Sequence, residues 1–170
     1  NNITASDSVV HGGVVVLNAV QSEAIASLTN VNLTAANFYL NASETATIRS
    51  TVDSTATASG GSAFGGGTVK AKNGAIASNL IQADAKAYVE KGSITTTGDM
   101  TITATNNASI TATNTSSLTS GDAASGVMLA FNTVGWKATN IFSKTIDALL
   151  GADFGTEDAA ETFAYVLDAV

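Results

Sequence analysis

Apolar and polar residues alternate along most of this chain, which is the pattern of β-strands that bury one face. The alternation is clearest from residue 93 to residue 118, where Ile, Met, Ala and Leu are separated by Thr, Asn and Ser. Gly98-Asp99 and Asn106-Asn107 interrupt it, and both pairs are residue types typical of turns. The pattern therefore predicts short strands joined by corners.

The same alternation predicts further short strands elsewhere in the chain. Their ranges are 14–17, 24–28, 31–34, 38–42, 45–52, 75–80 and 85–89. The chain is rich in Thr, Val and Ile, which favour strands over helices. It contains no Pro, which would remove a backbone donor from a central strand. We therefore predict an all-β fold.

The chain also repeats itself. At a constant offset of 61, Asn18, Gln21, Ala24 and Ala26 correspond to Asn79, Gln82, Ala85 and Ala87. After one inserted residue, Leu40, Ala42, Ala46 and Ile48 correspond to Ile102, Ala104, Ala108 and Ile110. A more divergent third copy is indicated by Ala164-Tyr165-Val166, which repeats Ala87-Tyr88-Val89. Self-similarity at a fixed period is typical of repeat proteins, whose units bury their apolar faces by stacking.

This repeat predicts a parallel β-helix, or β-solenoid. One third of the period is about 20 residues, which suits a three-sided coil of three short strands and three corners. We expect one solenoid domain over residues 1–170, with repeat units at about 14–75 and 76–125 and a divergent third unit at 126–170. Asn18 and Asn79 are predicted either to form a step of an asparagine ladder between coils or to lie in exposed turns.

Two other segments differ from the repeats. Residues 140–150 carry apolar side chains at three- and four-residue spacing with Gly151 after them, which predicts a helix, and a second helical turn is expected at 157–162. The third unit would therefore carry a short helical insertion near residues 140–162. The glycine-rich stretches 60–67 and 121–126 lack the spacing of a phosphate-binding loop, and we interpret them as tight turns or close packing.

Composition limits the classes of function. Only 12% of the residues are charged and the net charge is −7, which disfavours a nucleic-acid surface or a basic membrane anchor. No stretch approaches the length of apolar sequence that a membrane-spanning helix needs. The chain has no Cys, so it has neither disulfides nor thiolate metal ligands. Abundant Asn, Thr, Ser and Gly suit an extracellular structural protein better than a cytosolic enzyme.

Three segments resemble a known family. Residues 75–87, residues 92–105 with their strand, Gly98-Asp99 and alternating Thr and Ile, and residues 130–150 are similar to β-solenoid repeats of giant bacterial surface and secreted proteins. Filamentous-haemagglutinin-like exoproteins and other large adhesins contain such coils. The resemblance implies a parallel β-helix, an extracellular or cell-surface location and an adhesive or architectural role. It supplies no catalytic residues.

Enzymatic and metal-binding residues are sparse. His11 is the only histidine and is interpreted as a surface residue. Asp84, Glu90 and Asp99 could approach one another across coils, but solvated exterior positions are the better account of them. We therefore expect no enzyme activity and no cofactor. Calcium remains a weak possibility, and its best candidates are the acidic residues Asp153, Glu157, Asp158 and Glu161.

Threonine rows and glycosylation motifs are the remaining candidates for surface chemistry. Eight threonines could share one flat face that binds ice or carbohydrate: Thr95, Thr97, Thr101, Thr103, Thr105, Thr111, Thr113 and Thr115. Five Asn-x-Ser/Thr motifs could accept glycans: Asn2, Asn32, Asn41, Asn107 and Asn114.

We therefore expect a rigid rod segment of an extracellular fibre or adhesin. Its partners would be identical or similar solenoid segments stacked end to end, and a host or surface carbohydrate. No nucleic-acid partner and no membrane insertion are expected. The alternatives are a ligand-binding solenoid that uses its threonine rows and, with least support, a polysaccharide-active enzyme.

Overall fold

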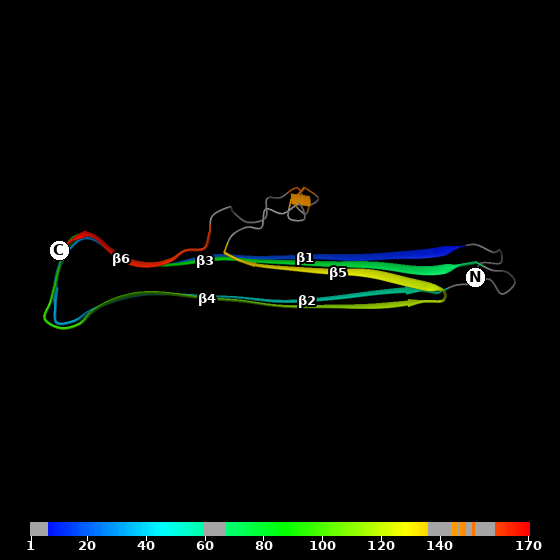
Figure 1. The fold of residues 1–170 in the computed structure, drawn as a ribbon, viewed down its shortest axis with the longest axis horizontal. Helices are drawn as coiled ribbons and strands as arrows, with labels where there is room; N and C mark the ends of the chain where they lie inside the picture. Colours follow the sequence, from blue (N-terminus) through cyan, green and yellow to red (C-terminus); the bar gives the residue numbers. More distant parts are fainter. Residues whose placement is uncertain (1–6, 60–66, 136–143, 146, 149–150, 152–158) are drawn as a thin grey trace. The chain divides into compact units, whose positions relative to one another are not determined.

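A computed structural model describes residues 7–59, 67–135, 144–145, 147–148, 151 and 159–170 of the chain. The fold is all-β, with parallel strands in its sheets (Figure 1). Its strands are β1 (Ser8–Ala35), β2 (Phe38–Ala58), β3 (Val69–Thr96), β4 (Met100–Ser120), β5 (Ala123–Val134) and β6 (Thr162–Ala169). In the part of the chain that the structure describes, no helix is long and apolar enough to cross a membrane.

The strands form two sheets. In the first, the order is β1-β3-β5, and β6 also pairs with β3; in the second, β2 pairs with β4. Side-chain hydrogen bonds join β1 to β3 at a constant difference of 61 residues and β2 to β4 at a difference of 62. A constant difference in residue number means that paired strands run parallel, whereas a constant sum would mean antiparallel pairing. The sequence repeat therefore records the register of the sheets.

The chain forms two compact units, and each of the strands β1 to β4 contributes a segment to both. Unit 1 comprises Asn1–Asn18, Arg49–Asn79 and Thr111–Asn132. In this unit the inward side chains of the two sheets make two apolar clusters. Val52, Ala75 and Ala77 pack with Val14 and Val16, and Ala58, Val69 and Ala71 pack with Val10 and Leu118.

Unit 2 comprises Ala19–Ile48, Leu80–Ile110 and Thr133–Val170. Its apolar cluster joins the inner faces of both sheets: Ala46, Ile48, Ile81 and Ala83 are buried, and Val20, Ala108 and Ile110 pack against them. In unit 1, β2 and β3 bury every second residue, as the period of a strand requires, whereas in unit 2 the first four residues of the β3 segment, Leu80 to Ala83, are all buried. Many of these residues are alanines, which fit the narrow space between closely facing sheets.

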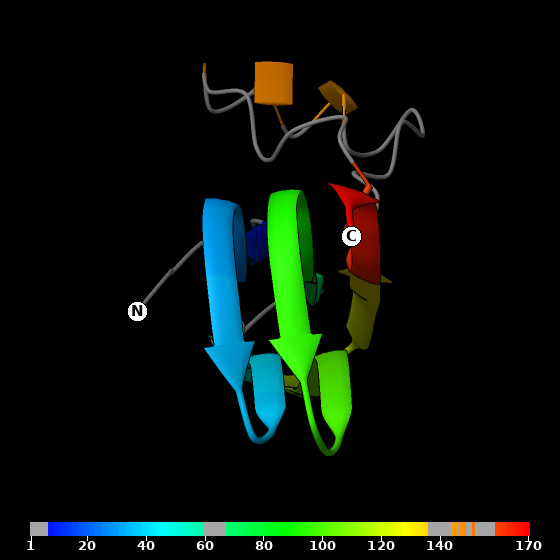
Figure 2. The same ribbon diagram turned by 90° about the vertical axis from the view of Figure 1, so that its left-hand side faces the viewer.

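In unit 2, three paired strands bend at one place. Asn30, Lys91 and Asp168 have φ values of 56°, 55° and 50°, although none of them is glycine. Lys91 lies 61 residues after Asn30, and the register of β3 with β6 places it opposite Asp168. Figure 2 shows the ends of β1, β3 and β6 side by side beyond these bends. A residue in the left-handed region changes the strand direction at the same point of each strand.

Glycine is required next to the bend. A Cβ atom on Gly92 would collide with the backbone carbonyl oxygen of Val31 on β1. The turn between β3 and β4 has the same requirement, because a Cβ atom on Gly98 would collide with the side chain of Asn37. The predicted turn at Gly98-Asp99 is therefore confirmed, and its glycine is needed for the close approach of the neighbouring turn.

The prediction of short strands, and with it the prediction of about 20 residues per coil, is wrong. β1 and β3 contain 28 residues each, and β2 and β4 contain 21. One period of 61 therefore holds two long strands and two connections. Asn106-Asn107 forms no turn, since both residues continue β4. Asn106 is tolerated there because its side chain faces inward and bonds a backbone carbonyl.

The third copy is confirmed in register, because Ala87, Tyr88 and Val89 pair with Ala164, Tyr165 and Val166. Most of the helix predicted at 140–150 lies outside the described residues; Lys144, Thr145, Asp147 and Ala148 are described and helical.

The outer bound of the predicted insertion is wrong. Residues 157 and 158 lie outside the described residues, 159–161 are not helical, and Thr162 begins β6. Of the first glycine-rich stretch, only Gly67 is described. In the second, Gly121 and Asp122 form the bend between β4 and β5, as predicted.

Candidate functional site

An asparagine ladder runs through unit 1. The side-chain amide of Asn18 on β1 donates a hydrogen bond to Oδ1 of Asn79 on β3 at 2.8 Å, and Asn79 in turn donates to Oδ1 of Asn132 on β5 at 2.8 Å. Asn79 is only 1% exposed. The ladder hypothesis for Asn18 and Asn79 is therefore confirmed over the exposed-turn alternative. The third step at Asn132 was not predicted.

Two further pairs of like side chains stack across strands of unit 2. Gln21 donates its side-chain amide to Gln82 at 2.9 Å. The rings of Tyr88 and Tyr165 are stacked, with centroids 5.3 Å apart and an interplanar angle of 6°. The Tyr165 hydroxyl donates to Glu90 at 2.6 Å, and this hydrogen bond raises the pKa of Tyr165 to about 12. Identical or similar side chains thus fix the register of β1 with β3 and of β3 with β6.

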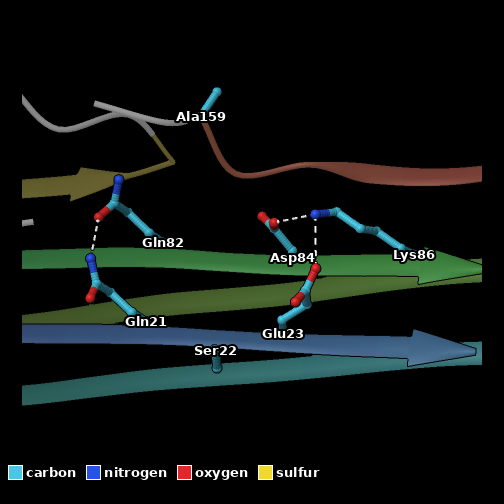
Figure 3. Close-up of a pocket in the computed structure, with 7 residues that line it drawn as sticks. All are labelled: Gln21, Ser22, Glu23, Gln82, Asp84, Lys86 and Ala159. Carbon is cyan, nitrogen blue, oxygen red and sulfur yellow. Dashed lines mark hydrogen bonds and ion pairs between the residues drawn. The ribbon is translucent and has the colours of Figure 1, made fainter. Parts of the chain in front are cut away.

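A charged cluster, here called the Lys86 cluster, consists of Glu23, Asp84, Lys86 and Glu161 in unit 2. Figure 3 shows Glu23, Asp84 and Lys86. Lys86 Nζ lies 2.8 Å from Glu23 Oε1, 2.8 Å from Asp84 Oδ2 and 3.5 Å from Glu161 Oε2. The offset of 61 places Glu23 opposite Asp84, and the register of β6 places Asp84 opposite Glu161. Three carboxylates therefore stand in one column across β1, β3 and the start of β6, with one ammonium between them.

The pKa values of this cluster follow from its geometry. Hydrogen bonds to Asp84 and Glu23 raise the pKa of Lys86 above its usual value. Burial opposes ionisation of Asp84, but hydrogen bonds from Lys86 and from the Glu161 backbone amide outweigh it and lower its pKa. Lys86 and Asp84 are therefore both charged near neutral pH. Like charges opposite each other in a sheet are destabilising unless a cation separates them.

A cavity of about 460 Å³ borders this cluster, lined by Gln21, Ser22, Glu23, Gln82, Asp84, Lys86 and Ala159. Its carboxylates Glu23 and Asp84 are occupied by Lys86, and a permanently charged ammonium is a poor general base. Asp84, Glu90 and Asp99 are not brought together: Asp84 bonds Lys86, Glu90 bonds Tyr165, and Asp99 lies in the turn beside Asn37. The geometry of the Lys86 cluster favours a role in holding β1, β3 and the start of β6 together over a role as a catalytic centre.

Among the described residues, no group of three or more His, Asp or Glu side chains is arranged to hold a metal ion. Of the acidic residues considered for calcium, Asp153, Glu157 and Asp158 lie outside the described residues, and Glu161 belongs to the Lys86 cluster. His11 is exposed on β1, as predicted.

A side-chain amide of β4 bonds the backbone of β3 in unit 2. The Gly135 amide donates to the Ile81 carbonyl, and the Ala85 amide donates to the Glu161 carbonyl. Between these points the Ala83 carbonyl accepts a hydrogen bond from the side-chain amide of Asn106 on the facing strand β4. Asn106 thus links the two sheets at this point of β3.

The threonine rows lie mostly on one strand. Thr101, Thr103, Thr105, Thr111, Thr113 and Thr115 are exposed on the outer side of β4, whereas Thr95 is exposed on β3 and Thr97 lies in the turn. Thr103 donates to Asn41 on β2 at 2.8 Å. In each unit, β4 therefore presents threonine hydroxyl and methyl groups at three successive outward positions.

Glycosylation motifs differ in access. Asn32, Asn41 and Asn107 are exposed, and Asn2 lies outside the described residues. The side chain of Asn114 faces inward: its amide donates to the Leu129 carbonyl at 3.1 Å, and its Oδ1 atom is buried. Asn114 is therefore a poor acceptor in the folded chain, because its amide nitrogen is already engaged inside.

The Lys86 cluster and the third ladder step were missed in the sequence, although the offset of 61 already aligns Glu23 with Asp84. Two aligned acids in a predicted ladder require a nearby cation, which Lys86 provides two residues later. A scan against protein-family models matches no family, and searches of curated proteins and of solved structures find no match.

Proposed function

We propose that this chain is a structural and adhesive module of an extracellular bacterial surface protein or fibre. Its parallel strands would form a β-solenoid that acts as a rigid rod. One winding would hold about 61 residues, as two long strands and two connections, instead of the three short coils expected from the sequence. The rod would stack end to end on identical or similar segments.

The observation that carries this proposal is the constant register of like side chains along β3. Asn79 bonds an asparagine on each neighbouring strand, and Tyr88 stacks on Tyr165. Repeated parallel pairing makes each strand level support the next, so stability grows with the number of levels. Such a stack resists bending and proteolysis, because its backbone groups are paired between levels. The extracellular location is inferred from the abundance of Asn, Thr, Ser and Gly and from the resemblance to repeats of bacterial surface proteins.

The test is amide hydrogen exchange together with limited proteolysis on the purified chain. We expect the slowest exchange in β3, which has neighbours on both sides, and no cleavage within β3 or β4 by proteases that cut elsewhere in the chain. Exchange of β3 amides as fast as those of Gly121 and Asp122 would refute a rigid stack. Glycan arrays and cell-binding assays test the adhesive part separately.

A second candidate function is the binding of ice or carbohydrate by the threonines of β4. It is favoured by the exposed side of this strand, where alternate residues are spaced about 7 Å apart. Thermal hysteresis or selective glycan binding that is lost in Thr103→Lys and Thr113→Lys would support it. A polysaccharide-active enzyme has least support, and release of reducing sugar from a glycan panel would establish it.

A further inference from the structure

Core-type residues are exposed on the last strands of the first sheet. β5 pairs with β3 at a difference of 53, so Met128 is aligned with Ala75 and Val134 with Ile81. Ala75 and Ile81 are 1% and 0% exposed, but Met128 and Val134 are 49% and 57% exposed. On β6, Val166 is 47% exposed, although its partner Val89 is 1% exposed. The same side of the sheet is thus buried on β3 and open on β5 and β6.

The number of strands explains this difference. The first sheet has β5 and β6 beyond β3, whereas within the described residues β4 is the last strand of the second sheet. Among the described residues, the inward position Gly126 of β5 lies close to Leu118 of β4, but Met128 in unit 1 and Val134 and Val166 in unit 2 stay exposed. In each unit, one more strand paired in parallel with β4 would cover these side chains. β4 offers it an edge of 21 residues.

We infer that the occupant of this edge is β1 of a second copy of the chain, an inference that rests on the proposed solenoid. At the opposite end of the first sheet, β1 is itself an edge strand. Its inward row includes Val10, Val14 and Val16, which are only partly buried although they pack against the core clusters. Both edges carry neutral inward residues, and both lack a neighbour on one side within the described residues.

Topology excludes the other free strand of the second copy. If β2 of the copy paired with β4, the β1 that precedes it would occupy the place already held by β5 and β6. Pairing β1 with β4 avoids this overlap and places β2 of the copy on β5 and β6. β1 and β2 run in opposite directions on the two sides of the turn at Ala36 and Asn37. The copy must therefore be rotated by half a turn about the axis along which copies stack, so that its β1 runs parallel to β4. The contact is head to tail, and repetition gives a filament.

The backbone of β1 shows where this contact can be blocked. The Ser8 amide donates to the Thr68 carbonyl, so even-numbered residues of β1 before the bend direct their backbone groups toward β3. Odd-numbered residues direct theirs toward the open edge, because the direction alternates along a strand. Proline at an exposed odd position such as Val15 removes only an edge donor. Val15→Pro should therefore disable the β1 edge while β1 remains paired with β3.

The β4 edge can be blocked by a charged side chain on β5 that points to the place where β1 of the second copy would lie. Met128→Lys places an ammonium there, and burying it without a partner should weaken association by at least about a hundredfold. Val127→Lys is the matched control, because Val127 is the adjacent residue, is 62% exposed and lies on the outer side of β5. Circular dichroism and thermal unfolding would confirm that each variant is folded.

The experiment is sedimentation velocity and negative-stain microscopy over a concentration series. We expect the native chain and Val127→Lys to form filaments, more strongly at high salt because each copy carries −7 charges. Met128→Lys and Val15→Pro should each be monomeric. A mixture of the two should give dimers only, since one supplies an intact β1 edge and the other an intact β4 edge.

Three results would overturn the inference. A native chain that stays monomeric at high concentration and salt would exclude the contact, and slow exchange in β3 of the same sample would leave the proposed rod intact. Dimers of Val15→Pro alone would indicate pairing between two β4 edges. Equal assembly of Met128→Lys and Val127→Lys would place the contact elsewhere.

Discussion

Replacing Asn79 tests whether the asparagine ladder stabilises the stack. In Asn79→Leu the side chain has similar size but neither accepts from Asn18 nor donates to Asn132. Each such hydrogen bond contributes about 0.5–1.5 kcal/mol net, and the half-buried amide of Asn18 loses its partner as well, so we expect a loss of about 2 kcal/mol. For a chain of this size that corresponds to a fall in Tm of roughly 4–8 °C.

Urea and thermal unfolding measure this loss, and Asn107→Leu is the matched control because Asn107 is exposed on β4. The control should stay within about 0.5 kcal/mol of the native chain. Asn79→Asp provides a second test: a buried carboxylate raises its own pKa, so this variant should gain stability as the pH falls and the group becomes neutral. Equal stability of Asn79→Leu and Asn107→Leu would refute the ladder as a source of stability.

Three further predictions concern other contacts. Gly92→Ala should cost about 1–3 kcal/mol because the new methyl group meets the Val31 carbonyl, whereas Gly74→Ala, with open space at its Cβ position, should be neutral or slightly stabilising in the same unfolding assay. Asn106→Leu should cost about 1–3 kcal/mol because the Ala83 carbonyl loses the hydrogen bond from the Asn106 side chain. Unchanged hydrogen exchange of the neighbouring amides in this variant would contradict that expectation. Lys86→Met should cost about 1 kcal/mol at neutral pH and remove a pH dependence of stability. The ionised Asp84 contributes its full stabilisation above pH 3.8 and loses it as the pH falls through its lowered pKa in the folded chain. The charged Lys86 contributes its full stabilisation below pH 10.5 and loses it as the pH rises through its raised pKa in the folded chain. A Lys86→Met chain with the native pH profile would contradict that account.

The sequence was sufficient to predict strand pairing, because a parallel stack places equivalent residues on top of one another. Asn18 with Asn79 and Tyr88 with Tyr165 were aligned by the repeat and are in contact. Strand length was not predictable in the same way. Asn106-Asn107 has the local composition of a turn, and its place in a strand depends on a carbonyl of β3 that no local pattern reveals.

Contacts between the two sheets were the least predictable part of the fold. Between β3 and β4 they join residues whose numbers have a constant sum of 189, as with Asn106 and Ala83, or Ser116 and Asn73. Such a relation is antiparallel and leaves no repeat in the sequence, since it depends on where the chain turns. The Lys86 cluster lies between these cases: its column of acids follows the repeat, but Lys86 lies two residues out of register with them.

The register of the last strands is set by different chemistry on the two sides of the insertion. The difference in residue number from β3 is 53 at Asn132 and 77 at Thr162, so 24 extra residues lie between β5 and β6. In unit 1 the amide of Asn79 holds β5, and in unit 2 Asp84 and Lys86 hold the start of β6. Between these contacts the side-chain amide of Asn106 on β4 donates to the Ala83 carbonyl of β3. Because each strand is fixed on β3 by its own contacts, the length of the insertion can change without shifting either register.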